Sequence, residues 1–187
     1  MNNKNTLPAS LAKVAATTLL ILLIPFTASL ISDEMAWSMY DFLLAGVMLF
    51  GTGSAYVLIS RQSNSLMYRV ASGLTLVTAL FLVWINLAVG VIGPEDNAGN
   101  LMYYGVILML MTGILAARFR PRGMANALFT AAFAQAATVP IALAREMQSL
   151  PGSSVMEIIL LNGMFVMLFA LSGGLYLKVT RKNETPL

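Results

Sequence analysis

Two long apolar runs joined by a short polar bend constrain this chain more than any other feature. Residues 74–117 read LTLVTALFLVWINLAVGVIGPEDNAGNLMYYGVILMLMTGILAA, and their only charged side chains are Glu95 and Asp96 in the bend 94–100. Each run approaches the ~20 residues that a helix needs to cross a bilayer. Water could not solvate so much apolar surface. The pattern therefore predicts a helical hairpin in a membrane, with a hydrated, acidic tip.

The composition extends this interpretation to the whole chain. Hydrophobic residues make up 58% of the sequence and charged residues only 10%, whereas soluble domains have about 25% charged residues. Backbone groups in lipid must find their hydrogen-bond partners within the protein, which leaves helices and closed barrels. The apolar runs are continuous and do not alternate with polar residues as barrel strands do. The sequence therefore predicts an all-α membrane protein.

Six such runs predict one transmembrane domain over residues 1–187, built as a six-helix bundle. The expected spans are 11–31, 40–60, 70–93, 101–117, 124–144 and 156–179. The first run is longer than the apolar part of a signal peptide, so we expect it to be retained, with cleavage as the alternative. The chain also divides into three tandem helical hairpins, because Gly46, Gly105 and Gly163 each precede a basic residue by fifteen positions.

The charged residues predict the orientation of this bundle. Ten of the eleven basic residues fall on the side of the termini, and Arg145 is the exception. Seven of the eight carboxylates fall on the other side, and Glu184 is the exception. Because Lys and Arg collect on the cytoplasmic side of membrane proteins, we expect both termini in the cytoplasm. The net charge of +3 then reflects topology and contact with anionic lipid, and no nucleic-acid partner is expected.

The chain contains no cysteine and no histidine. This excludes disulfides and thiolate nucleophiles, and it removes the usual ligands of haem and of transition metals. The thirteen methionines could offer thioethers to Cu(I), but flexible core filling explains them better. We therefore expect no cofactor, no metal and no catalytic residues, and we do not expect an enzyme.

Three amide side chains at membrane depth are the first candidate site: Asn86, Gln135 and Asn162. Asn86 lies on a small, polar face of its span, and Gln135 shares a stripe with alanines and a threonine. Such faces pack against other helices, and the larger apolar faces meet lipid. Hydrogen bonding between helices is the favoured interpretation of the three amides. The alternative is a polar intramembrane cavity that all three line.

Four carboxylates on the side opposite the termini are the second candidate. Asp41 and Glu157 lie near the starts of spans, and Glu95 and Asp96 lie in the bend. Hard cations such as Ca²⁺ take several oxygen ligands, so the four could form an outer cation site. The favoured alternative is structural, because acidic groups stabilise helix N-termini. In that interpretation Asn100 caps the fourth span.

The fifth span should be the most enclosed helix. It contains nine alanines in twenty-one residues, which permit close backbone approach and offer little bulk to lipid. We expect Ala134→Leu or Ala137→Leu to overpack the bundle.

Two stretches carry a resemblance to known proteins. WINLAVGVIGPEDNAGNLMYYGV at residues 84–106 and ARFRPRGMANALF at residues 117–129 resemble a group of small, uncharacterised integral membrane proteins of bacteria. The resemblance covers the middle third of the chain. It implies a location in the bacterial inner membrane, and it implies no activity and no functional residues.

Two classes of function fit these observations. The first is an accessory or structural membrane protein that acts through helix–helix contacts with a second copy or with another membrane protein. The second is a transporter or channel for a small solute or an ion. The first predicts that neighbouring helices fill the small-residue faces, and the second predicts a wet cavity that reaches the amides.

Overall fold

A computed structural model of the chain describes residues 6–31 and 37–184. These residues form helices and turns, without β-strands. Six of the helices in the described part are long and apolar enough to cross a membrane. They are α1 (Leu7–Ile31), α2 (Met39–Ser60), α3 (Leu66–Ala88), α4 (Leu101–Ala116), α5 (Pro121–Ala144) and α6 (Val155–Glu184). Short 3-10 helices η2 (Ala98–Asn100) and η3 (Met147–Ser149) precede α4 and α6. The predicted all-α, multi-pass architecture is thus compatible with the structure.

Several helix boundaries differ by three to five residues from the expected ones, and two of them have a clear physical reason. We predicted that the third span reaches residue 93, but α3 ends at Ala88 because Gly90 and Gly93 turn the backbone to φ values of +77° and +62°. Their neighbours are apolar, so hydropathy alone continues the helix through them. The sequence also predicts that the fifth span begins at residue 124, yet α5 begins at Pro121. Proline is well suited to a first helical position, where its missing N–H has no intrahelical partner to lose.

The described residues fall into two compact units, one that ends at Arg61 and one that begins at Gln62. A single transmembrane domain stays a prediction. In the first unit, α1 and α2 pack as a helical hairpin. Gly53 of α2 lies against Val14 of α1, where an added Cβ would come within 2.5 Å of the valine side chain. At the same end, Arg61 Nη2 donates a hydrogen bond of 3.0 Å to Ser10 Oγ.

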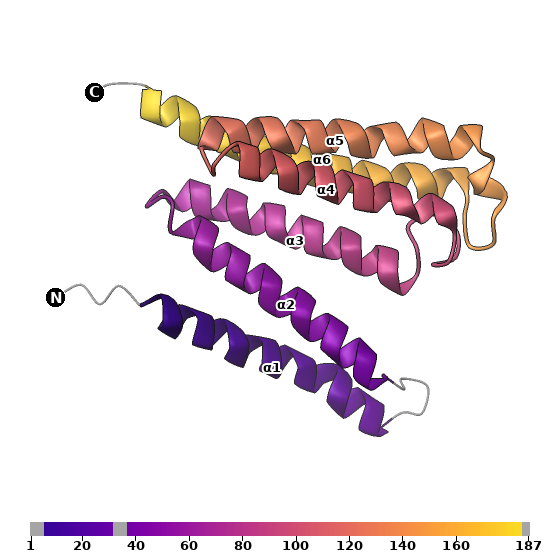
Figure 1. Cartoon of the computed structure of the whole chain (residues 1–187). Coiled ribbons are helices and arrows are strands. Elements are labelled where there is room, and N and C mark those ends of the chain that lie inside the picture. Colours follow the sequence, from indigo (N-terminus) through magenta and orange to yellow (C-terminus); the bar gives the residue numbers. More distant parts are fainter. Residues whose placement is uncertain (1–5, 32–36, 185–187) are drawn as a thin grey trace. The chain divides into compact units, whose positions relative to one another are not determined.

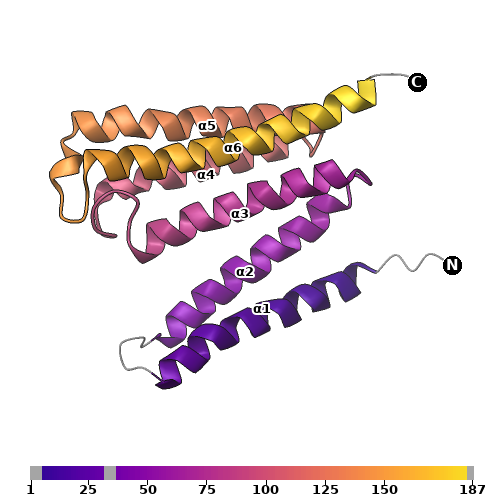
Figure 2. The same ribbon diagram turned by 180° about the vertical axis from the view of Figure 1, so that it is seen from behind.

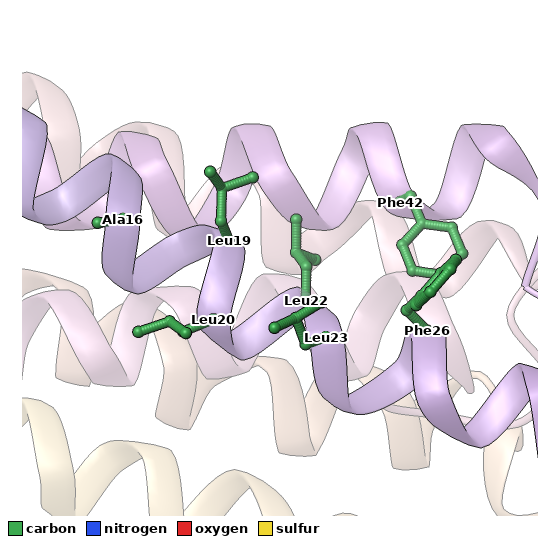
Figure 3. Close-up of a pocket in the computed structure, with 7 residues that line it drawn as sticks. All are labelled: Ala16, Leu19, Leu20, Leu22, Leu23, Phe26 and Phe42. Carbon is green, nitrogen blue, oxygen red and sulfur yellow. The ribbon is translucent and has the colours of Figure 1, made fainter.

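An apolar groove runs along the α1–α2 hairpin (Figure 3). Six of its seven lining residues lie on α1, and Phe42 of α2 is the seventh. The rings of Phe26 and Phe42 close it with an edge-to-face contact at 6.3 Å between centroids. Because only apolar side chains line the groove, its surface suits acyl chains or other apolar groups.

The second unit is a four-helix bundle. α6 packs against both α5 and α3, α4 packs against α5, and α3 and α4 touch much less. Figure 1 shows α4 on the near side of the bundle, and Figure 2, from behind, shows α6 on the near side. α5 and α3 therefore lie on opposite sides, with α4 and α6 between them. At one close contact, Gly113 of α4 faces Ala127 of α5, and an added Cβ would lie 2.8 Å from the alanine Cβ.

The buried faces of this bundle match those expected from the sequence. On α3, Ser72, Thr75, Leu82 and Asn86 are buried, and Val77 and Phe81 on the other face are exposed. On α5 the predicted stripe is buried throughout: Ala131, Gln135, Thr138 and Ala142. α5 also has the largest buried share of the six described spans, at 39% of its most apolar window. Ala134 and Ala137 are only half-buried, so they are poor positions for an overpacking test.

Ala131 is a position on α5 where added volume should destabilise the bundle. Its side chain is fully buried, and Ala131→Leu should lower the free energy of unfolding by about 1–3 kcal/mol, because a packed interior cannot absorb the extra carbons without strain. Ala136→Leu is the matched control, since Ala136 is exposed on the same helix. Thermal unfolding in detergent measures both variants. Equal melting temperatures for the two would contradict the buried position of Ala131.

Candidate functional site

Two of the three predicted amides meet inside the four-helix bundle. Gln135 Nε2 on α5 donates a hydrogen bond of 2.9 Å to Asn162 Oδ1 on α6. The Thr138 hydroxyl, one turn along α5, lies 2.9 Å from the same Oδ1 and 2.7 Å from the Gln135 carbonyl oxygen. Asn162 Nδ2 donates to the Ile158 carbonyl oxygen at 2.8 Å. Gln135 and Asn162 are 0% exposed and Thr138 is 3% exposed, so this amide pair joins α5 to α6 away from solvent.

Tyr103 completes this cluster from α4. Its side chain is buried, and its hydroxyl lies beside Asn162 and Thr138. The hydroxyl makes no hydrogen bond with any described residue, and neither does Gln135 Oε1. Tyr103 could not be selected from its position in the sequence, because tyrosine near the start of a span normally marks the membrane interface. The cluster therefore contains four uncharged polar side chains from three helices and has spare hydrogen-bonding capacity at two atoms.

Asn86 lies apart from this cluster, in the last turn of α3. Its Nδ2 donates a hydrogen bond of 3.2 Å to the Asn100 carbonyl oxygen, and its Oδ1 has no partner among the described residues. The three amides were expected to line one cavity if they served transport. The structure brings Gln135 and Asn162 together and places Asn86 in a different hydrogen-bond network.

Asn100 is the centre of that network. Its Oδ1 accepts hydrogen bonds from the backbone N–H groups of Val91 and Ile92, both at 3.0 Å. Its Nδ2 donates to the Pro94 carbonyl oxygen at 2.9 Å. The expected capping of α4 by the Asn100 side chain is wrong, because that side chain makes no capping bond to the helix. It reaches back instead, since the residues after Gly90 have left the helix and present free N–H groups.

A third polar contact joins α3 to α6 near the other end of the bundle, and the sequence did not indicate it. The hydroxyls of Ser72 on α3 and Tyr176 on α6 lie 2.7 Å apart. The Tyr68 ring meets the Tyr176 ring edge to face at 5.2 Å, and the Tyr68 hydroxyl donates to the Phe119 carbonyl oxygen at 2.8 Å. Phe119 lies in the tight turn between α4 and α5. Tyr68 and Tyr176 therefore connect α3 to α6 and to the turn between α4 and α5.

The four predicted carboxylates have separate surroundings. Asp41 Oδ2 accepts hydrogen bonds of 2.8 Å from both the N–H and the hydroxyl of Ser38, and the Asp41 N–H donates to Ser38 Oγ at 3.3 Å, which completes a capping box at the start of α2. This is the structural role that the sequence favoured. Glu95, Asp96 and Glu157 are exposed in the second unit. Within residues 6–31 and 37–184, no three side chains of the metal-binding types gather. The outer cation site stays a prediction.

No protein-family model, curated protein or solved structure matches this chain. The amides and hydroxyls of the described polar contacts are uncharged groups that exchange hydrogen bonds. In their observed arrangement they connect helices.

Proposed function

We propose that this protein is a non-enzymatic accessory protein of the bacterial inner membrane that acts through helix–helix contacts with a second copy or with another membrane protein. The hydrogen bond between Gln135 and Asn162 carries this proposal. Both amides are fully enclosed, and the Gln135 side-chain N–H donates to the Asn162 side-chain carbonyl oxygen across the α5–α6 contact, as polar groups do between packed membrane helices. A path for a polar solute would instead leave such groups accessible to water.

The double variant Gln135→Leu, Asn162→Leu tests this proposal against the transport alternative. It replaces both partners by apolar groups of similar size, a change that can leave stability almost unaltered. An accessory protein should then still restore the phenotype of a deletion strain. A transporter should fail, because leucine cannot replace the hydration of a polar solute. A folded, normally inserted double variant that does not restore the phenotype would contradict the accessory role.

The single variant Asn162→Leu should be the less stable protein. It leaves the Gln135 side chain without its partner, and interhelical hydrogen bonds of this kind contribute about 0.6 kcal/mol on average and up to roughly 1.7 kcal/mol. We expect its melting temperature in detergent to fall below that of the double variant. The reverse order would show that the pair does not stabilise the bundle.

For the orientation, we propose that both termini lie in the cytoplasm. In the four-helix unit, the end formed by the starts of α3 and α5 holds seven basic residues: Arg69, Arg118, Arg120, Arg122, Lys178, Arg181 and Lys182. The opposite end holds Glu95, Asp96, Glu146 and Glu157, with Arg145 as the one cation among the described residues there. This distribution supports the positive-inside orientation. Lys4, Asp33 and Glu34, which entered the sequence prediction, lie outside the described residues.

Single cysteines test the orientation cleanly, because the chain has none of its own. Asn97→Cys in the acidic bend should react with an impermeant thiol reagent on cells whose inner membrane is intact. Ser65→Cys and Asn183→Cys should react only after the membrane is opened. Labelling of Ser65→Cys with protection of Asn97→Cys would reverse the orientation.

The arrangement as three tandem hairpins belongs to the same proposal. The pairs α1–α2 and α5–α6 pack as hairpins, which supports it. α3 packs mainly on α6 and much less on α4. The two helices of the middle hairpin would therefore be in weaker contact with each other than those of the other two hairpins.

A further inference from the structure

The acidic end of the four-helix unit contains a groove that neither candidate site includes. It lies between the segment that follows α3 and the first turns of α6, and it has a volume of about 480 Å³. Glu157 is the one charged residue in its lining. Leu160, Leu161 and Met164, which follow Glu157 along α6, form the apolar wall on that helix, and Val89 and Val91 add apolar side chains from the segment after α3.

The order of these residues along α6 gives the groove a polar end and an apolar end. Met164 lies seven positions after Glu157, which corresponds to about 10 Å along a helix. Glu157 is in the first turn of a helix long enough to span the bilayer, so it lies near the headgroup region. Met164 then lies at the depth of the acyl chains. A groove with this polarity fits a lipid-like molecule, with its head at Glu157 and a chain along Leu160 and Leu161.

Three glycines supply polar backbone to the same lining: Gly90, Gly93 and Gly152. Their N–H groups donate no hydrogen bond to any described residue, although the neighbouring Val91 and Ile92 amides are bound by Asn100. Gly90 and Gly93 are buried, and buried backbone N–H groups without a partner are rare in proteins. Free backbone N–H groups of this kind commonly bind anionic oxygens.

The net charge at the acidic end of the four-helix unit indicates which lipid headgroup the groove would bind. Four described carboxylates, Glu95, Asp96, Glu146 and Glu157, face one cation, Arg145. This surplus of negative charge disfavours a lipid with a net negative headgroup. A headgroup with a primary ammonium beside a phosphate complements the groove, because Glu157 can accept from the ammonium and the glycine N–H groups can donate to the phosphate.

We propose that this groove is a binding site for an aminophospholipid of the ethanolamine type, in the leaflet that faces the acidic end. The Glu157 carboxylate binds the primary ammonium, and Leu160, Leu161 and Met164 contact an acyl chain. The site requires only that α6 lies in the bilayer. It is independent of whether the protein acts as an accessory protein or as a transporter.

Competition between lipids of one chain type tests the site. The purified full-length protein in detergent is mixed with equal amounts of dioleoyl phosphatidylethanolamine, phosphatidylcholine and phosphatidylglycerol, and native mass spectrometry counts the lipids that stay bound. We expect phosphatidylethanolamine to be retained most. Phosphatidylcholine has the same net charge, but its quaternary ammonium cannot donate a hydrogen bond. Equal retention of all three lipids by the unaltered protein would overturn the proposal.

Substitutions at Glu157 then test whether the preference for phosphatidylethanolamine arises at this groove. Glu157→Gln should lower the preference for phosphatidylethanolamine by about two- to fivefold, the range for an exposed ion pair, and Glu157→Lys should shift it toward phosphatidylglycerol. Glu146→Gln removes a charge from the same end outside the groove and should leave the preference unchanged. A loss in Glu146→Gln as large as that in Glu157→Gln would assign the preference to overall charge and overturn the site.

Discussion

Gly90→Ala should be among the most destabilising single substitutions in this protein. Gly90 has a φ of +77°, where an L side chain costs roughly 1–2 kcal/mol. An added Cβ would also lie 2.6 Å from the Gly93 carbonyl oxygen and 2.7 Å from Asn100 Nδ2. The segment would have to move, and overpacking adds about 1–3 kcal/mol. We expect a total loss of about 2–5 kcal/mol in the free energy of unfolding.

Gly152→Ala separates the two contributions to this loss. Gly152 also has a positive φ, at +66°, but no atom lies within 4 Å of the position of an added Cβ. This variant should therefore lose only the backbone contribution of about 1–2 kcal/mol. Thermal unfolding of both variants in one detergent makes the comparison. A Gly152→Ala protein as unstable as Gly90→Ala would show that the crowding around Gly90 has no energetic effect.

The helical architecture could be predicted from the sequence because one physical requirement dominates it, the need to satisfy backbone hydrogen bonds in lipid. An apolar run that must enter lipid has to satisfy its own backbone, and the helix does so. The buried faces also followed from the sequence, since Asn86 and Gln135 lie on small-residue stripes and helical spacing places each stripe on one side. The enclosed pair of Gln135 and Asn162 fits the interpretation that was favoured for those amides.

The details that hydropathy missed depend on backbone geometry and on distant partners. Val89 to Gly93 is an apolar stretch, so its hydropathy continues α3, and only the positive φ of Gly90 and Gly93 shows where the helix ends. Asn100 immediately precedes α4, and asparagine is a favoured residue at the N-terminal cap of a helix. Its actual acceptors and donors lie six to nine residues earlier in the chain, a pairing that no helical or strand spacing encodes.

The tyrosine contacts were missed for a related reason. Tyr103 and Tyr176 are in apolar runs where an aromatic ring is equally suited to lipid, to the interface or to the core. Only the packing of the helices brings the Tyr103 hydroxyl beside Asn162 and the Tyr176 hydroxyl within hydrogen-bond distance of Ser72. A single sequence contains no signal for such pairs, because the residues are 59 and 104 positions apart.

Asn100→Ala should match or exceed Gly90→Ala in its effect on stability. The substitution removes the acceptor of the Val91 and Ile92 N–H groups and the donor to the Pro94 carbonyl oxygen. Val91 is 6% exposed and Ile92 is 1% exposed, so water does not readily replace the lost acceptor. Each buried polar group left without a partner costs about 1–3 kcal/mol. We expect the variant to lose about 2–6 kcal/mol in the free energy of unfolding.

Asn97→Ala is the matched control in the same bend. Asn97 also bonds to backbone through both side-chain atoms, but it holds only one N–H group, that of Gly99, and is itself half-buried. Its loss should therefore be smaller than that of Asn100→Ala. Hydrogen exchange gives a local readout, because the Val91 and Ile92 amides should exchange faster in Asn100→Ala and keep their protection in Asn97→Ala. If both amides stayed protected in Asn100→Ala, the Asn100 side chain would not be what orders the segment between α3 and α4. Some other contact would then hold Gly90 and Gly93 in their positions in the groove beside Glu157.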